Sequence, residues 1–215
     1  MTGLLSEETK LRDEIVAVGR SIFDRGLTGG STGNISVRLS NGSMLMTPTN
    51  ASLGNLDPVR LSLLDRNGVH VSGDKPTKEA FLHTCMYCAR GGDNAVVHLH
   101  STHSVAVSIL NGVDSDDVLP PLTAYYVVRV GTLPLIPYFA PGDQALAEAV
   151  AAKADRHHAV LLANHGPVVS GTSLANAQYA VEELEETAKL FLMVKDWPVR
   201  LLTAKQVADL KSRFG

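Results

Sequence analysis

The sequence has few of the features that mark membrane, secreted or nucleic-acid-binding proteins. No apolar run reaches the ~18 residues of a membrane span, and the charged segment 7–14 offers no signal-peptide core. With a formal net charge of −3 and 5% aromatic residues, the chain lacks the basic field and the stacking surfaces that nucleic acid requires. We therefore expect a cytoplasmic protein that binds neither a membrane nor nucleic acid.

Cysteine is also scarce. The chain has only Cys85 and Cys88, in a C-x-x-C spacing. Redox pairs of this spacing lie at a helix start just after a strand, whereas this pair falls well inside an expected helix over residues 78–89. A zinc finger is disfavoured as well, because the nearby H-x-H at 98–100 is too tight for the usual finger spacing. We expect two buried core thiols.

What the chain does have is ample material for a packed core, with 215 residues of which 45% are hydrophobic and 19% charged. No linker-like stretch and no repeat divides it. We therefore expect a single domain over residues 1–215.

Periodic patterns predict the main elements of this domain. An apolar stripe predicts a first helix with Ser6 as its N-cap, and two Asn-Gly turns predict two hairpins. The run 127–136 is typical of a strand, and the last long helix is expected to carry four glutamates, among them Glu185, on a solvated face. We expect His83 to be structural or on the surface. For His103 we expect a position beside the substrate or no role in the site, and we rank both above a role as a metal ligand.

Three other histidines are candidate metal ligands. The apolar run 95–97 is typical of a buried strand, and His98 and His100 follow it one residue apart. Alternate strand side chains share a face, so both imidazoles are expected on one side. A third, His165, comes at a tight turn after the apolar run 161–163. Three histidines with an open fourth position describe a catalytic zinc, although H-x-H alone is as often a pair of ordinary strand histidines.

Three segments together suit an anion. The glycine-rich segment 26–36 lacks the G-K-[ST] of a nucleotide P-loop, but its hydroxyls and free N–H groups suit a phosphate; a flexible loop is the alternative. The turn 47–49 is a second hydroxyl-rich segment, and Thr77, the expected N-cap of a helix, and Lys78 form a third. Glu79 is either a carboxylate favoured by the helix dipole or an acid or base beside a metal.

Five short motifs in a fixed order carry a resemblance to a known family. They are Gly33-Asn34-Ile35-Ser36, Thr47-Pro48-Thr49, Lys75-Pro76-Thr77-Lys78-Glu79, His98-Leu99-His100 and Asn164-His165-Gly166. From about residue 10 to 195 the chain resembles the class II aldolase and adducin family, which includes fuculose-phosphate aldolase and ribulose-phosphate 4-epimerase. Within that family, the segments 123–126 and 137–143 are most similar to the 3-oxo-tetronate 4-phosphate decarboxylases.

The resemblance implies an α/β fold, a three-layer α/β/α sandwich around a largely antiparallel mixed sheet. It also implies a homotetramer with active sites between neighbouring subunits, and one Zn²⁺ per subunit, with Mn²⁺ or Co²⁺ able to take the same ligands. The zinc ligands correspond to His98, His100 and His165. The family's acidic residue, which holds the metal in the empty site and works as acid or base once substrate displaces it, corresponds to Glu79. The phosphate-binding positions correspond to Asn34, Thr47, Thr77 and Lys78. A tyrosine that reaches into the next subunit's site corresponds to Tyr125.

The chain departs from the aldolases and epimerases at several positions. The fuculose aldolases carry Gly where this chain has Asn50 and Ser-Ser where it has Thr77-Lys78. They also use a tyrosine in a mobile C-terminal tail, but no tyrosine follows Tyr179 here. The epimerases use an aspartate shortly before a G-T-x-P stretch, whereas no acidic side chain lies between Tyr125 and Gly131.

The resemblance therefore predicts a zinc-dependent lyase. It would decarboxylate a 3-oxo-tetronate 4-phosphate to dihydroxyacetone phosphate and CO₂ through a metal-stabilised enediolate, with Glu79 or Tyr125 as proton donor. The alternative is a sugar-phosphate aldolase of the fuculose-1-phosphate type, which uses the same intermediate. A ribulose-phosphate 4-epimerase and a non-enzymatic adducin-like protein are less favoured. The full histidine set with Glu79, and the absence of a basic tail, argue against the adducin branch.

Overall fold

An eight-stranded sheet forms the middle layer of the structure, a computed structural model that describes residues 2–140 and 142–214. The strands are β1 Asn34–Arg38, β2 Met44–Met46, β3 Ser62–Leu64, β4 His70–Ser72, β5 Ala95–His98, β6 Leu135–Ile136, β7 Ala159–Leu162 and β8 Gly166–Gly171. Their order is β4-β3-β2-β1-β5-β8-β7-β6, and every neighbouring pair is antiparallel except β6 with β7. The two predicted hairpins are β1–β2 and β3–β4.

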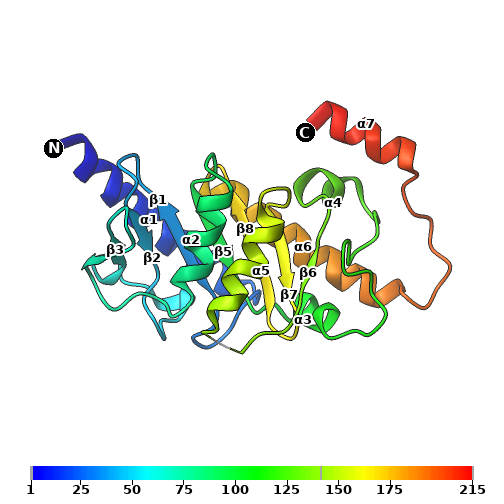
Figure 1. Ribbon diagram of the computed structural model, residues 1–215, viewed down its shortest axis with the longest axis horizontal. Coiled ribbons are helices and arrows are strands. Elements are labelled where there is room, and N and C mark those ends of the chain that lie inside the picture. Colours follow the sequence, from blue (N-terminus) through cyan, green and yellow to red (C-terminus); the bar gives the residue numbers. More distant parts are fainter. Residues whose placement is uncertain (1, 141, 215) are drawn as a thin grey trace.

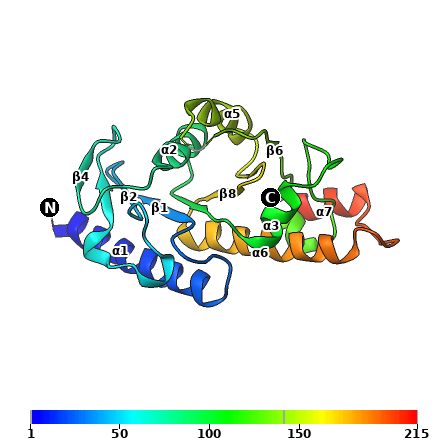
Figure 2. The ribbon, with the colours of Figure 1, turned by 90° about the horizontal axis from the view of Figure 1, so that it is seen from below.

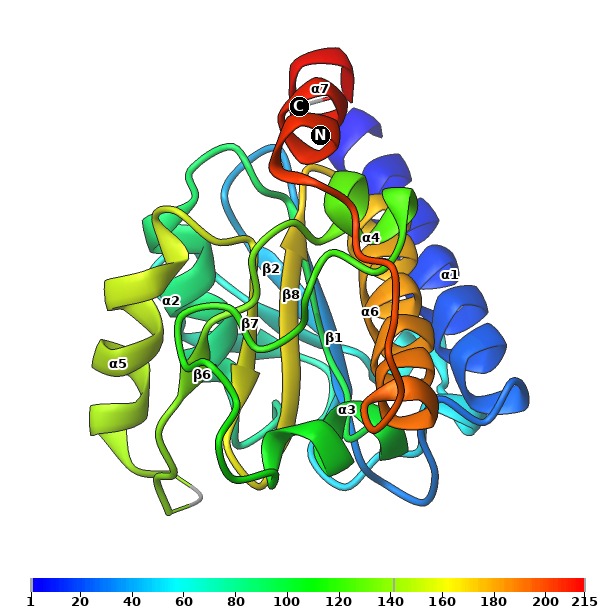
Figure 3. The same cartoon turned by 90° about the vertical axis from the view of Figure 1, so that its right-hand side faces the viewer.

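Helices cover both faces of this sheet (Figures 1 and 2). The helices are α1 Thr2–Asp24, α2 Ala80–Ala89, α3 Thr102–Ser108, α4 Ala124–Arg129, α5 Gln144–Ala154, α6 Leu174–Val194 and α7 Ala204–Phe214, with short 3₁₀ turns at Leu53–Asn55 and Pro58–Arg60. Figure 3 shows α1 and α6 on one face and α2 and α5 on the other. The predicted three-layer α/β/α fold is confirmed. None of the described helices is long and apolar enough to cross a bilayer.

The two faces of the central strands have different partners because strand side chains alternate. On β1, Ile35 and Val37 belong to the core that α1 and α6 complete. On β5, Val97 joins the same core, whereas Val96 packs with α2 and α5. By the same alternation His98 faces the α2 side, and this places it beside the start of that helix.

The segment 127–136 is not the strand that its β-branched residues predict. Residues 127–129 instead complete the helix α4, which the Thr123 hydroxyl caps by accepting from the Tyr126 N–H at 3.1 Å. Gly131 ends the helix, since its φ of +78° is left-handed and its N–H bonds back to the Tyr126 carbonyl. Only the last two residues of the run form a strand, β6, which is parallel to β7.

Two smaller predictions also fail. Ser6 is not an N-cap, because α1 begins at Thr2 and Ser6 lies inside it. Cys88 is exposed and Cys85 is only partly buried, and both are free thiols. They line a groove between α2 and α5 that the core does not fill, so the expectation of two buried core thiols is wrong.

Glu185 is buried, with 6% of its surface exposed, although the helical pattern places it on a solvated face. Its carboxylate accepts from the backbone N–H groups of His103 at 2.9 Å and Ser104 at 2.8 Å. The His103 Nδ1 and the Ser104 hydroxyl bond to the same carboxylate. Glu185 of α6 therefore caps the N-terminus of α3. The free N–H groups at that helix end need an acceptor, and this tertiary interaction outweighs the local charge pattern that favours an exposed side chain. It also gives His103 a partner on α6.

Candidate metal centre

The candidate site lies at the end of the sheet where β1 begins and β5 ends. His98 is the last residue of β5, and His100 follows two residues later. Antiparallel pairing brings the start of β8 beside the end of β5, so the turn that carries His165 lies there too. Glu79 approaches from the neighbouring layer, as the residue directly before α2.

The turn between β7 and β8 permits a close approach to the loop after β5. Asn164 has a left-handed φ of +56°. A Cβ atom at Gly166 would lie 2.2 Å from the Leu99 carbonyl oxygen, so only glycine fits there. The sequence Asn164-His165-Gly166 therefore holds His165 against His100.

Helix α2 begins later than its sequence predicts, and this places Glu79. Thr77 is not the N-cap: the helix starts at Ala80, and Glu79 occupies the capping position without a side-chain cap bond. The Thr77 hydroxyl instead accepts from the Glu79 N–H at 3.3 Å. The carboxylate of Glu79 is thus free to point toward the histidines.

The four side chains bring their potential ligand atoms within 4.8 Å of one another. The Nε2 atom of His100 lies 3.1 Å from that of His98 and 3.1 Å from that of His165. The Glu79 carboxylate is 3.1 Å from His165 Nε2 and 3.5 Å from His98 Nε2. Ligands at ~2.1 Å from a tetrahedral ion lie roughly 3.4 Å apart, so the donor set fits one divalent cation.

The protonation states also suit a metal. The Nδ1–H group of His98 donates a hydrogen bond of 2.8 Å to the Pro167 carbonyl, which leaves the lone pair on Nε2 free to bind a metal. Burial lowers the pKa of His98 to about 3 and also lowers the pKa of His100, so both are neutral. Burial disfavours the charged form of Glu79, but the hydrogen bonds from His165 and the Asn34 amide and the nearby His98 imidazole outweigh it and hold the pKa of Glu79 well below its usual range.

A cavity of about 320 Å³ opens onto this cluster. Its lining comes from three segments, 31–34, 48–50 and 77–79, together with His100 and Gly142. These are the three segments that the sequence predicts as an anion cradle, and they meet around one space. Asn34, Thr77 and Lys78, three of the expected phosphate-binding residues, line it.

Thr47 differs from the other expected phosphate-binding residues. It is 1% exposed, and its hydroxyl accepts from the Ile35 N–H at 3.1 Å, so it serves the β1–β2 connection beneath the cavity. Thr49 and Asn50 of the same turn line the cavity instead. Asn50 has a φ of +59°, a conformation that glycine and asparagine adopt most easily. This accounts for asparagine at a position where the fuculose aldolases carry glycine.

Tyr125 does not reach this centre within one chain. It is 67% exposed and lines a different cavity, of about 480 Å³, together with Gly171 and Thr172. Gly171 ends β8, whereas the turn of His165 precedes the start of that strand. The two sites therefore lie at opposite ends of the sheet. At the metal centre, the Asn34 amide also donates a hydrogen bond of 2.7 Å to Glu79, a contact that no sequence pattern predicts.

A family model described as Class II Aldolase and Adducin N-terminal domain matches residues 13–192. The chain is 49% identical over 212 residues to the 3-oxo-tetronate 4-phosphate decarboxylase of Escherichia coli K12, covering 99% of this chain and 100% of the relative. It is 33% identical to the L-fuculose phosphate aldolase of the same organism, covering 97% and 95%. A crystal structure of YgbL from Escherichia coli superposes with a TM-score of 0.93 at 48% identity, covering 95% and 99%.

Proposed function

The chain belongs to the class II aldolase and adducin family, and from this premise we propose that it is a metal-dependent lyase that decarboxylates a 3-oxo-tetronate 4-phosphate. The observation that carries the proposal is the cluster of Glu79, His98, His100 and His165 at the mouth of a cavity with a lysine. The nearly complete coverage by a decarboxylase relative at 49% identity favours this reaction over that of the aldolase relative at 33%.

The substrate is a β-keto acid, and this determines what the site must do. The bond between C1 and C2 breaks, CO₂ leaves, and the electron pair moves toward the C3 carbonyl to form an enediolate. When bound, a divalent metal supplies positive charge that stabilises the negative charge developing on the carbonyl oxygen. A proton added at C2 then gives dihydroxyacetone phosphate.

The residues of this chain divide that work. His98, His100 and His165 would hold the metal, which we propose to be one Zn²⁺ per subunit, with Mn²⁺ or Co²⁺ as alternatives. Glu79 would hold or move the proton, because it is the titratable group that adjoins both the histidines and the cavity. Asn34, Thr77 and Lys78 would grip the phosphate, with Thr49 beside them, so that its binding energy fixes the reacting end at the metal.

A homotetramer with shared active sites is part of the proposal. Tyr125 is exposed and lies away from the metal centre of its own chain, as a residue that serves a neighbouring subunit would. The cavity beside Tyr125 is lined by further exposed apolar side chains, Val128 at 38% and Phe214 at 65%. Helix α7, which carries Phe214, packs against α4 at the edge of the sandwich (Figure 1). The cytoplasmic location stays a prediction from the sequence.

Parallel assays test the proposed reaction. We expect the metal-loaded protein to release CO₂ and dihydroxyacetone phosphate from a 3-oxo-tetronate 4-phosphate, and to turn over fuculose 1-phosphate and ribulose 5-phosphate much more slowly. The enediolate is common to decarboxylation and aldol cleavage, so only the products separate the two. Faster cleavage of fuculose 1-phosphate would identify the protein as an aldolase, and loss of all three activities would favour a non-enzymatic relative.

The phosphate grip predicts a specific effect on affinity. Lys78→Met removes the cation of the cavity and should raise KM about 10-fold to 100-fold, the range for a lost charged hydrogen bond, while kcat changes little. Lys75→Met is the matched control, because Lys75 is an exposed lysine three residues away that does not line the cavity. Steady-state kinetics of both variants decide the matter. Equal KM values would remove Lys78 from the phosphate site.

A further inference from the structure

A row of polar side chains runs away from Glu79 between β1 and α2. On the strand, Asn34, Ser36 and Arg38 are spaced by two residues and face the helix. On the helix side, Glu79, His83 and Tyr87 are spaced by four residues and face the strand. Two strand residues advance ~6.6 Å and four helical residues ~6 Å, so the two sets stay in register. We call these six residues the β1–α2 ladder.

The ladder is continuous from Tyr87 to the metal centre. The Tyr87 hydroxyl lies 2.8 Å from Ser36 Oγ, which lies 2.7 Å from His83 Nδ1. His83 Nε2 lies 2.5 Å from Asn34 Oδ1, and the Asn34 amide donates to Glu79 Oε2 at 2.7 Å. Ser36 and His83 are fully buried, and Asn34 and Tyr87 are 4% exposed. The surrounding layer is otherwise an apolar core.

The chemistry of each group gives the ladder one direction. A carboxylate only accepts, so Asn34 turns its NH₂ to Glu79 and its oxygen to His83. His83 must then carry its proton on Nε2, and burial lowers its pKa to about 4, so Nδ1 is an acceptor. Ser36 therefore donates to His83, and Tyr87 donates to Ser36. Every buried polar atom along this row is satisfied in that single arrangement.

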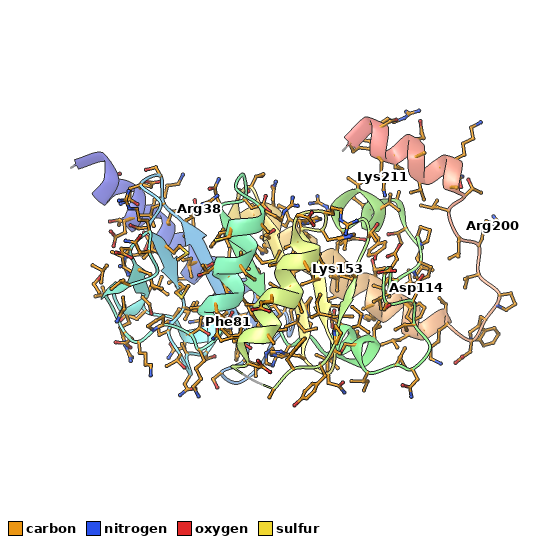
Figure 4. All side chains as sticks on the ribbon, in the orientation of Figure 1. Arg38, Phe81, Asp114, Lys153, Arg200 and Lys211 are labelled. Atoms are coloured by element: carbon orange, nitrogen blue, oxygen red, sulfur yellow. The ribbon has the colours of Figure 1, made fainter. Side chains whose placement is uncertain are left out.

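The outer end of the ladder is anchored to backbone. The Arg38 guanidinium stacks on the Tyr87 ring, 5.1 Å from its centroid, and donates to the carbonyl groups of Gly91 and Asp93. In Figure 4, Arg38 lies toward one end of α2, and Phe81, two residues after Glu79, lies toward the other. The ladder thus ties the carboxylate to a rigid point at the far end of the helix.

We propose that His83 is a positioning residue that, through Asn34, fixes one oxygen of Glu79 and leaves the other for the metal centre and the substrate. This inference rests on the proposed function, in which Glu79 moves a proton. An amide N–H donates a hydrogen bond without giving up its proton, so Asn34 interrupts any proton relay, and the ladder orients the carboxylate instead of supplying it with protons. Without His83 the Asn34 amide could turn its oxygen toward Glu79.

The tautomer of His83 tests the ladder without any turnover. In ¹⁵N NMR of the metal-free protein, Nε2 of His83 should be protonated and Nδ1 should not. A proton on Nδ1 would reverse the direction derived above and overturn the proposal. This readout holds even if the protein proves to have a different substrate, so it separates failure of the ladder from failure of the proposed function.

Kinetics of matched variants test the positioning role. His83→Phe keeps a ring but removes the N–H, and we expect kcat to fall about 10-fold to 100-fold, with KM changing less than kcat, because Asn34 also borders the phosphate site, and with metal content unchanged. His83→Gln places an N–H near Nε2 and should restore much of that loss. Ser36→Ala, which leaves the His83 N–H in place, covers the case in which the Phe variant does not fold. It should lower kcat relative to the unaltered protein, again with a smaller change in KM and with metal content unchanged.

Thr84→Val is the control, because among the described residues the Thr84 hydroxyl bonds to the Ala80 carbonyl of its own helix alone. It should leave kcat unchanged. An unchanged kcat in the folded Phe variant, or a Ser36→Ala variant with unchanged kcat where the Phe variant does not fold, would overturn the proposal. So would a joint loss of metal, affinity and rate that Gln does not restore, because that pattern belongs to a purely structural residue.

Discussion

Removal of the divalent metal is expected to lower kcat by at least about 10³-fold, because the charge that develops on the substrate carbonyl oxygen then has no cation to stabilise it. Purified protein should contain about one divalent ion per chain, lost on dialysis against a chelator and restored by Zn²⁺, Mn²⁺ or Co²⁺. The basis is the convergence of three imidazole Nε2 atoms and a carboxylate within 4.8 Å.

A pair of histidine variants makes this prediction specific. His100→Ala removes the imidazole that lies 3.1 Å from both other histidines, and it should abolish metal binding and turnover together. His70→Ala is the control, since His70 is exposed on β4 and its ring, within the part of the chain that the structure describes, bonds to the nearby Ser72 carbonyl alone. Metal analysis and activity measured on the same samples give the result. A His100→Ala protein that keeps its metal would show that the imidazoles do not share one ion.

Glu79→Gln should produce the second large effect, a loss of roughly 10²–10⁴ in kcat, the range for general acid/base catalysis. The change keeps the shape of the side chain and its ability to accept from Asn34, but it removes the titratable group. Three histidines remain, so metal content and the affinity for phosphorylated substrate should persist. The measurement is kcat and KM of the metal-loaded variant beside its metal content.

A purely structural role for Glu79 predicts a different outcome. As a helix-start charge only, it would contribute ~0.3–1 kcal/mol to the free energy of unfolding, and the rate would not change. Asp57→Asn is a useful comparison, because Asp57 caps a short 3₁₀ turn through the Val59 N–H outside the metal centre. A normal kcat in Glu79→Gln would indicate that Tyr125 of a neighbouring subunit, and not Glu79, is the acid/base group.

Local pattern is sufficient for those parts of this protein that depend on a short stretch of chain. The hairpins follow from Asn-Gly turns, and α5 follows from Asp143, which accepts from the Ala145 N–H at its start. His98 and His100 meet with their Nε2 atoms 3.1 Å apart, as their spacing of two residues predicts, although the strand ends at His98 and His100 lies just beyond it. Each of these depends on neighbours within a few residues, which a periodicity or a capping residue records directly.

The same local signals mislead where a helix cap or a distant element competes with them. Valines at 127, 128 and 130 favour a strand, but Thr123 and Gly131 cap a helix. Glu185 belongs to a charged helical face, but the N-terminus of α3 takes it into the interior. The energy of a capped helix end exceeds the preference of these residues, and the sequence pattern does not show which ends meet.

The arrangement of the site depends on sheet register and helix packing. The pairing of Asn34 with His98 brings the start of β1 to the metal centre, and the packing of α2 on β1 aligns Glu79, His83 and Tyr87 with the strand. Repeats of two and of four residues are visible in the chain, but a shift of one strand residue would turn every side chain to the other face. Residue types and local elements can thus be predicted from the sequence. The register that brings them together is set by the burial of both faces of the sheet, which is a property of the whole fold.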